Sequence, residues 1–162
     1  MKIAVISDTH FREKESWLPP EVEKILGGIG FIVHCGDFET YFAYEKMKEM
    51  GRLTAVCGNM DTPRIREILP ARLVFEAAGY KIGVTHGDGP PAGIEDRVAA
   101  QFPEKVDVIL FGHSHQPQNQ VRNGVLFFNP GSPTDRRFAP FNSFGIIGLT
   151  ENGVRGEILK LE

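Results

Sequence analysis

Five apolar runs of the sequence each end in residues that can bind metal ions. The five segments are Asp8-Thr9-His10, Gly36-Asp37, Gly58-Asn59, His86-Gly87 and Gly112-His113-Ser114-His115. Each segment alone is compatible with an ordinary turn, because Asp, Asn and Gly are common there. Together they contain four of the five histidines, and each follows a predicted strand. Their joint position therefore indicates one shared site rather than five unrelated turns.

The candidate ligands combine carboxylate, imidazole and amide groups and contain no thiolate. They are Asp8, His10, Asp37, Asn59, His86, His113 and His115. Such a set suits Mn²⁺, Fe²⁺, Zn²⁺, Co²⁺ or Ni²⁺ better than Ca²⁺ or a structural Zn²⁺. Seven ligands are too many for one tetrahedral ion, but they suit two ions that share a bridging carboxylate. Two ions about 3.5–4 Å apart promote phosphoryl displacement, because one activates water and both stabilise the charge on the phosphate oxygens.

The first part of the chain alternates apolar runs with amphipathic segments. Strands are predicted at residues 2–7, 31–35 and 53–57. One helix should begin at Pro19-Pro20 and stop at Gly27-Gly28, and a second should span Glu39 to Met50. This order favours a parallel sheet covered by helices. Because ligands bind at the carboxyl ends of parallel strands, the metal-binding segments should converge on one edge.

From Arg72 onward the pattern becomes mainly that of strands. Strands are predicted at residues 72–77, 80–85, 106–111, 118–121, 125–129, 143–149 and 154–161, with one helix at 94–100. Asn123-Gly124 and Asn152-Gly153 are typical two-residue hairpin turns. Two packed sheets with helices outside would satisfy both halves. Neither a repeat nor a linker interrupts the pattern, so residues 1–162 are expected to form one domain.

The bulk composition narrows the class of protein. A net charge of −3 and a pI of about 6.0 disfavour a general binder of long nucleic acid, which would carry a basic surface. The two cysteines, Cys35 and Cys57, lack CxxC spacing and are expected to be reduced and mostly buried, as is typical of a cytoplasmic protein. The N-terminal apolar stretch is too short for a signal peptide. No run approaches the roughly 20 apolar residues of a membrane span.

The ordered series D-T-H, G-D, G-N, H-G and G-H-S-H resembles that of the calcineurin-like metallophosphoesterases. The short length and the segment NPGSP (residues 129–133) are most similar to the small prokaryotic phosphodiesterases of that superfamily, the YfcE-type group. Retromer subunits with the same fold are further relatives. The resemblance covers nearly the whole chain. It implies an α/β fold, a four-layer α/β/β/α sandwich of two mixed β-sheets flanked by helices.

The resemblance also implies how the ligands divide between two divalent ions. One ion would be held by Asp8, His10, Asp37 and His115, and the other by Asp37, Asn59, His86 and His113. Asp37 would bridge the ions, and a water or hydroxide between them would attack phosphorus in line. Manganese is the expected metal, with nickel, cobalt, iron and zinc as alternatives. Asn59, His86 and Asp61 are the residues expected to take part in catalysis.

The sequence departs from the superfamily pattern after the third strand. Many members have G-N-H there, and that histidine is thought to protonate the leaving group, whereas this chain has Gly58-Asn59-Met60-Asp61. Met60 cannot donate a proton, and the small phosphodiesterases also lack the histidine. Asp61 is then either the acid or a residue that orients a ligand histidine. Without a dedicated acid, substrates with good leaving groups should react best.

Four further residues have open roles. Asp88 stands where the subgroup often has a second histidine, and its charge near the site would weaken binding of a doubly charged monoester. His34 is expected to be packed or hydrogen-bonded, with support of the metal site as the alternative. Arg136 and Arg137 lie in a predicted loop, as a solvated turn or as contacts to the substrate phosphate.

These expectations favour a metal-dependent phosphodiesterase with an open pocket that acts on a small or exposed phosphodiester in the cytoplasm. No membrane partner is expected, and a homo-oligomer is left open. One alternative is a non-catalytic scaffold on the same fold, as in the retromer relatives. The other is a phosphomonoesterase or a nuclease, although the acidic balance makes long nucleic acid the least favoured substrate.

Overall fold

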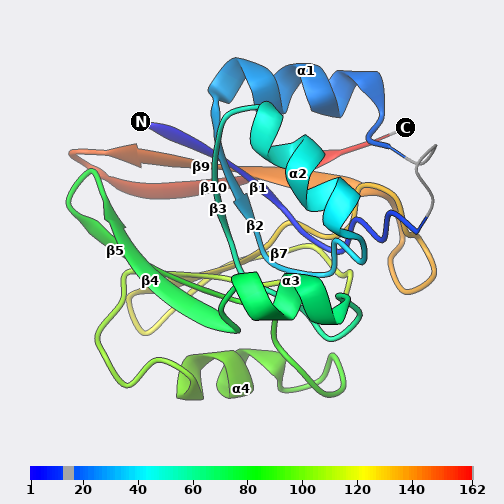
Figure 1. Cartoon of the computed structure of the whole chain (residues 1–162). Helices are drawn as coiled ribbons and strands as arrows, with labels where there is room; N and C mark the ends of the chain where they lie inside the picture. Colours follow the sequence, from blue (N-terminus) through cyan, green and yellow to red (C-terminus); the bar gives the residue numbers. More distant parts are fainter. Residues whose placement is uncertain (13–16, 162) are drawn as a thin grey trace.

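The computed structural model describes residues 1–12 and 17–161. In these residues the chain forms two five-stranded sheets that pack face to face, with four helices outside them (Figure 1). The first sheet consists of β1 (Lys2–Ile6), β2 (Phe31–His34), β3 (Arg52–Ala55), β9 (Ser143–Thr150) and β10 (Gly153–Lys160). The second consists of β4 (Arg72–Ala77), β5 (Tyr80–Thr85), β6 (Val108–Leu110), β7 (Gln118–Arg122) and β8 (Val125–Asn129).

Both sheets are mixed. The first has the order β10-β9-β1-β2-β3, in which β1, β2 and β3 are parallel and β9 runs antiparallel to β1 and β10. The second has the order β4-β5-β6-β8-β7, in which β5, β6 and β8 are parallel and the two edge strands are antiparallel to their neighbours. The parallel strands of each sheet thus share a carboxyl edge, as the sequence pattern predicts.

The helices cover the outer faces of the sandwich. Helices α1 (Pro20–Ile29), α2 (Tyr41–Glu49) and α3 (Pro63–Ile68) pack their buried residues against the outer face of the first sheet, and α4 (Ile94–Ala100) packs against that of the second. None of the helices in the described part of the chain is long and apolar enough to cross a membrane.

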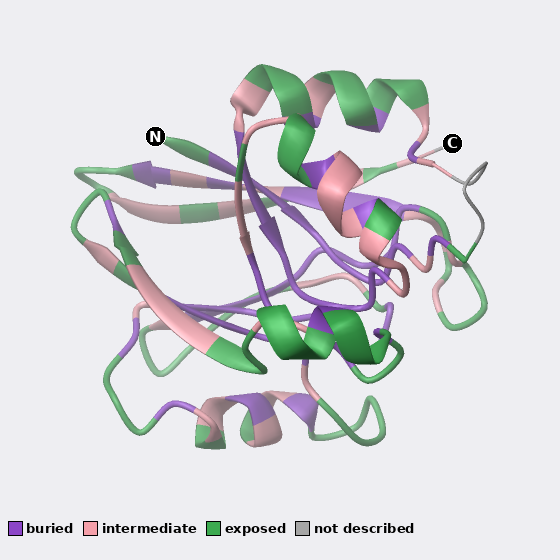
Figure 2. Cartoon of the chain, in the orientation of Figure 1, coloured by how far each residue is buried: buried purple, intermediate pink, exposed green. Residues whose placement is uncertain are grey.

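Strand alternation explains why the central strands are apolar throughout. In β1, Ile3 and Val5 point into the core between the sheets, whereas Ala4 and Ile6 point into the layer beneath α1 and α2. All four side chains are fully buried, as the colouring of the inner strands shows (Figure 2). A strand that is covered on both faces has no polar face to alternate with.

Two helix predictions differ from the structure. The predicted stop at Gly27-Gly28 is wrong, because α1 continues to Ile29 and ends at Gly30, which has a left-handed φ of 70° and donates its N–H to the carbonyl of Leu26. Helix α3 is absent from the sequence prediction, since six residues are too few to show helical periodicity.

Of the two cysteines expected to be buried, Cys35 is buried and Cys57 is only partly buried, and both are free thiols.

The Phe128 ring of β8 contacts the facing strands of the other sheet. It packs over Gly145 of β9 and Gly156 of β10, where an added Cβ atom would lie 2.3 Å and 2.6 Å from ring atoms. Phe128 itself is fully buried in the core between the sheets. Glycine at both positions therefore lets the two sheets approach closely next to Asn129, the residue that ends β8.

The substitution Gly145→Ala should lower the free energy of unfolding by about 1–3 kcal/mol, because the new methyl group has no room beside Phe128. Gly148→Ala in the same strand is the matched control, since the nearest atom to its Cβ would be the Arg155 carbonyl at 3.7 Å. Urea denaturation of both variants measures the difference. Equal midpoints for the two variants would contradict the close packing at Phe128.

Candidate metal centre

The seven candidate ligands lie together at the carboxyl edge of both sheets. Asp8 and His10 follow β1, Asp37 follows β2, Asn59 follows β3, His86 follows β5, and His113 and His115 follow β6. A pocket of about 250 Å³ opens at this edge, and five of the seven ligands line it. It is lined by His10, Arg12, Asp37, Asn59, Met60, His113, His115, Arg137 and Phe138. The first sheet supplies four of the seven ligands and the second supplies three.

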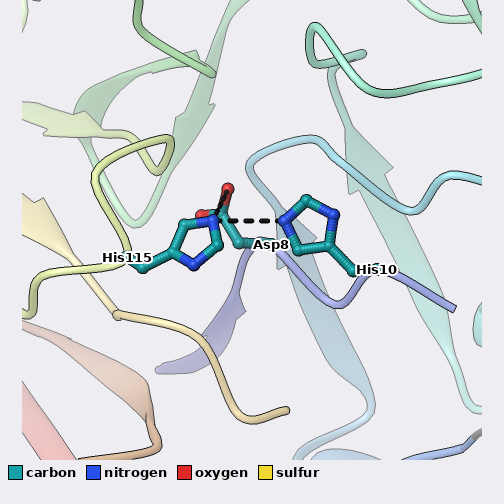
Figure 3. A group of neighbouring side chains, drawn as sticks. All are labelled: Asp8, His10 and His115. Atoms are coloured by element: carbon teal, nitrogen blue, oxygen red, sulfur yellow. Dashed lines mark hydrogen bonds and ion pairs between the residues drawn. The ribbon is translucent and has the colours of Figure 1, made fainter. Parts of the chain in front are cut away.

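One group of potential ligand atoms gathers around His10 and His115. The Nε2 atoms of these two histidines are 3.1 Å apart, and the Nε2 atom of His115 is 3.4 Å from Oδ1 of Asp8 (Figure 3). Figure 3 shows one nitrogen of each imidazole ring pointing toward the other ring, with the Asp8 carboxylate beside the His115 nitrogen. These three side chains are close enough to hold a single ion.

A second group gathers around Asn59. Its Oδ1 atom lies 3.0 Å from both Nε2 of His86 and Nδ1 of His113, and Nε2 of His86 is 3.2 Å from Oδ2 of Asp37. The same Asp37 oxygen is 3.9 Å from Nε2 of His10, so this carboxylate lies between the two groups. Oδ1 of Asp8 is likewise 3.9 Å from His86. His113 therefore belongs to the second group and His115 to the first.

Hydrogen bonds outside the cluster determine which nitrogen carries the proton in three of the four histidines, His10, His86 and His113. Nδ1 of His86 is 2.8 Å from the Cys35 carbonyl, and Nε2 of His113 is 3.0 Å from the Gly89 carbonyl. A carbonyl can only accept, so these nitrogens must be the donors, and in the neutral imidazole the other nitrogen bears a lone pair. Nδ1 of His10 lies 2.6 Å from the Glu39 carboxylate, which also accepts, so this nitrogen is a donor as well.

The lone pairs of these imidazoles therefore point at one another and at the oxygens of Asp8, Asp37 and Asn59. Acceptors in van der Waals contact repel unless a cation lies between them. Ligand atoms about 2.0–2.2 Å from a metal ion are themselves roughly 3 Å apart, as these atoms are. The donor set is imidazole, carboxylate and amide, which fits a borderline divalent ion.

Comparison with known proteins gives the family. Residues 1–152 match the family model of the calcineurin-like phosphoesterase superfamily domain. This chain belongs to the calcineurin-like phosphoesterase superfamily. The family and the α/β sandwich inferred from the motif series are both confirmed. Membership supports phosphoester hydrolysis with divalent metal ions as the class of activity.

Individual members of the superfamily resemble the chain over most of its length. A probable metallophosphoesterase from Methanocaldococcus jannaschii is 38% identical over an alignment of 166 positions, which covers 100% of this chain and 82% of that protein. A phosphodiesterase from the same archaeon is 25% identical over an alignment of 148 positions, which covers 81% of this chain and 83% of that protein. Wild-type Vps29 from Entamoeba histolytica, complexed with Zn²⁺, has a similar fold, with a TM-score of 0.76, 23% identity and 99% coverage of both chains.

In this superfamily member, unusual backbone conformations aim the ligands. Asp8, His10, Asp37, His113 and His115 all have a left-handed φ, between 48° and 67°. The two histidines of GHSH lie beyond the end of β6 at Leu110, so strand alternation does not set the direction of their side chains. Non-glycine residues in this region are strained and persist where the surrounding structure holds them.

Glycines next to the ligands let the buried carboxylates approach the backbone. A Cβ atom on Gly58 would lie 2.1 Å from Oδ1 of Asp37, and one on Gly112 would lie 2.6 Å from Oδ2 of Asp8. The glycines of the G-N and G-H-S-H segments thus have a steric role. Each leaves room for the carboxylate that comes from the neighbouring loop.

Asp61 holds the Asp37 loop by its backbone. Its carboxylate accepts hydrogen bonds from the N–H groups of Asp37, Glu39 and Gly58, at 3.1, 2.8 and 2.7 Å. The expected contact between Asp61 and a ligand histidine is therefore wrong. Burial raises the pKa of Asp61, although these N–H groups oppose the change. Both oxygens are engaged with the loop, and Asp61 is not among the residues that line the pocket.

Two carboxylates that were not predicted from the sequence lie behind the histidines. Glu39 accepts the Nδ1–H of His10, whereas an oxygen of Asp135 is 3.8 Å from Nδ1 of His115, beyond hydrogen-bond distance. A carboxylate bonded as Glu39 is fixes the orientation of the ligand imidazole and makes it more basic. The hydrogen bonds from Arg137 hold the pKa of Asp135 at about 2. Glu39 stands only two residues after Asp37, a position that could have signalled its role.

The charged residues whose roles were left open differ in their position relative to the metal pocket. Arg137 lines the pocket, and so does Arg12, which the sequence analysis does not single out, whereas Arg136 is exposed and outside it. Asp88 pairs with Arg97, with 3.3 Å between its Oδ1 and the arginine Nε. Asp88 is also absent from the residues that line the metal pocket.

The buried ionisable groups stabilise one another in the metal-free protein. Burial alone would raise the pKa of Asp8, but the hydrogen bond from His115 and the charge of His86 outweigh it and lower the pKa. Burial would lower the pKa of His86, but Asp37 and Asp8 raise it to about 9. A divalent ion would replace that proton between the carboxylates.

His34 is packed and hydrogen-bonded, as expected. It stacks on Phe38 with 3.5 Å between ring centroids, and its Nδ1 atom accepts the N–H of Gly36 at 3.1 Å. Its Nε2 atom must then be the donor to the hydroxyl of Thr9, 3.1 Å away. His34 thus connects the loop of Asp8 and His10 to the loop of Asp37. Burial lowers the pKa of His34 to about 3.

The low pKa of His34 predicts acid destabilisation of the metal-free protein. Between the ordinary pKa of 6.5 and about 3, the unfolded chain takes up a proton at this residue and the native chain does not, so the free energy of unfolding should fall as pH falls. The slope from this group approaches about 1.4 kcal/mol per pH unit. His34→Gln should flatten the profile in this window, measured by urea unfolding at several pH values. An unchanged slope would show that His34 does not stay neutral in the native state.

Proposed function

We propose that the chain is a phosphodiesterase that holds two divalent metal ions at Asp8, His10, Asp37, Asn59, His86, His113 and His115. The observation that carries the proposal is the convergence of acceptor atoms in two groups, which share the Asp37 carboxylate. The archaeal relative named a phosphodiesterase supports the choice of diesters. Manganese is the metal we propose first, from the mixture of oxygen and imidazole ligands.

The chain's own groups prepare the site for an anionic phosphate. Bound ions would activate water and stabilise the charge that develops on the phosphate oxygens. Imidazoles that bind metal ions are neutral and add no charge, so two carboxylates against two divalent ions would leave about +2 at the site. Glu39 keeps the His10 ring oriented, and Asp61 fixes the loop of Asp37. The site can therefore attract a phosphate although the protein as a whole carries a net charge of −3.

The surroundings of the pocket favour esters with good leaving groups. Met60 occupies the place of the usual acid and is exposed at the pocket wall, and the ring of Phe138 is exposed 5.7 Å from that of His115. Neither side chain can protonate a departing alkoxide, but both offer apolar surface to an aromatic group. The proposed substrate is a small diester whose leaving group is weakly basic.

The second candidate is a non-catalytic scaffold, favoured by the likeness in fold to Vps29. An intact set of seven ligands, with their supporting hydrogen bonds, is more than a scaffold needs. A panel of activated aryl diester, activated monoester and single-stranded nucleic acid, run with Mn²⁺, Ni²⁺, Co²⁺, Zn²⁺ and Mg²⁺, separates the candidates. Absence of hydrolysis with every metal would favour the scaffold.

The two groups of ligands predict the effect of removing one histidine from each. His113→Ala and His115→Ala should each lose a different one of two bound ions, and activity on bis(para-nitrophenyl) phosphate should fall by more than about 100-fold. Metal content by mass spectrometry and steady-state kinetics measure the two effects. Gln116→Ala, exposed in the same loop, is the matched control and should keep both ions. Full activity of His113→Ala would refute the site.

Asp61→Asn distinguishes a loop-holding residue from a general acid. Loss of one charged acceptor for three N–H groups should cost about 1.5–3 kcal/mol of stability and weaken metal binding. Activity should fall by the same factor for a para-nitrophenyl and a phenyl diester of one alcohol. A general acid would instead be needed far more for the poorer phenoxide leaving group, so a much larger loss with the phenyl ester would restore the catalytic role.

A further inference from the structure

Two arginines stand at the rim of the metal centre in matching arrangements. Nε of Arg12 donates to both oxygens of Glu39, at 3.0 and 2.9 Å, and Nε of Arg137 donates to both oxygens of Asp135 at the same distances. Glu39 in turn contacts His10, and Asp135 lies near His115. Each arginine thus lies behind a carboxylate that faces a histidine of the first ligand group.

The two arginines border a groove that adjoins the metal pocket. The groove has a volume of about 360 Å³ and is lined by Thr9, His10, Arg12, Thr134, Asp135 and Arg137. Three of these residues, His10, Arg12 and Arg137, also line the metal pocket, so the two spaces adjoin each other at these side chains. A molecule whose phosphate lies at the metal centre can therefore extend into the groove.

The arginines are held in place but remain accessible. Their side chains are 54% and 57% exposed, whereas the carboxylates that hold them are only 12% and 10% exposed. Within the described residues, the hydrogen bonds of Arg12 use Nε alone, and those of Arg137 use Nε and Nη2. Both terminal nitrogens of Arg12 and Nη1 of Arg137 are left to bind a ligand. Preorganised guanidinium groups lose little entropy when they bind an anion.

The loop that carries Arg137 is anchored to the metal loop. The hydroxyl of Ser132 donates to the carbonyl of Asp8, and the hydroxyl of Thr134 donates to the carbonyl of Thr9, both at 2.7 Å. These bonds fix the base of the loop relative to the ligands. Exposed ion pairs contribute little to stability, so folding alone is a weak reason for two such pairs around one groove.

We propose that Arg12 and Arg137 bind a second anionic group of the substrate, a phosphate carried on the same small molecule as the scissile diester. The metal centre would take the scissile phosphate and the groove would take the other. This inference rests on the proposed phosphodiesterase activity and narrows its substrates to small diesters that carry a second phosphate group. Charge-assisted bonds to phosphate are well suited to the planar guanidinium.

Two matched substrates test the proposal in the manganese-loaded protein. One is the para-nitrophenyl ester of thymidine 5′-phosphate, and the other is the same ester with an additional 3′-phosphate. In both, water replaces nitrophenolate at phosphorus, so the chemical step is identical. The 3′-phosphate should lower KM by about tenfold, as expected for one or two exposed charge-assisted hydrogen bonds.

The double variant Arg12→Gln, Arg137→Gln should bring the ratio of the two KM values close to one. Arg136→Gln is the matched control, because that arginine is exposed in the same loop and lines neither space; it should keep the wild-type ratio. A wild-type ratio near one, or a double variant that keeps the tenfold ratio, overturns the proposal. If the double variant merely disturbed His10 and His115, both KM values would rise together and their ratio would stay near tenfold. That outcome would also overturn the proposal.

Equilibrium binding keeps the inference separate from the proposed activity. Calorimetry with thymidine 3′,5′-bisphosphate and thymidine 5′-phosphate measures the same preference without turnover. A roughly tenfold tighter bisphosphate complex in the wild type, absent from the double variant, supports the anion site even if neither ester is hydrolysed. Equal affinities of the two nucleotides for the wild type refute the site even if both esters are hydrolysed.

Discussion

The burial of two carboxylates, Asp8 and Asp37, is the constraint on which the rest of the site depends. Both lie almost completely out of water at the carboxyl edge of the sheets. Such groups are costly to bury unless donors or cations surround them. Backbone N–H groups supply some of these donors, since Asp8 accepts the N–H of His113 and Asp37 accepts that of Met60. The remaining oxygen atoms face the imidazoles, where a cation completes the arrangement.

Much of the local sequence follows from this constraint. Gly58 and Gly112 are glycines because a carboxylate occupies the space of a Cβ atom. Five of the seven ligands adopt left-handed backbone conformations, in the loops that follow the strand ends. The carbonyls of Cys35 and Gly89 accept the outward N–H of His86 and His113, so the other nitrogen of each ring faces the cluster. Metal ions that bind there would stabilise the folded state.

The site also depends on the packing of one sheet against the other. Asp8 and Asp37 come from the first sheet, and His86, His113 and His115 come from the second. The inner core, with Phe128 seated over two glycines, sets the separation of the sheets. The loop after β8 then crosses back, where Ser132 and Thr134 bond to the backbone of the Asp8 loop. Arg137 follows these two residues and is thereby carried to the rim of the pocket.

The sequence alone determined the order of the elements and the identity of the seven candidate ligands. Both depend on local signals, namely apolar runs and the polar residues that end them, and on the rule that parallel strands share a carboxyl edge. The helix end at Gly30 was not predicted because Gly27 and Gly28 offer an earlier stop in the sequence. The helix α3 was not predicted because six residues are too few to show helical periodicity. Only the tertiary structure decided the proton positions on the histidines, the loop-holding role of Asp61, and the places of Arg12 and Arg137. Each of these follows from contacts between residues far apart in the chain, such as Asp8 with His113, and no local pattern encodes such contacts.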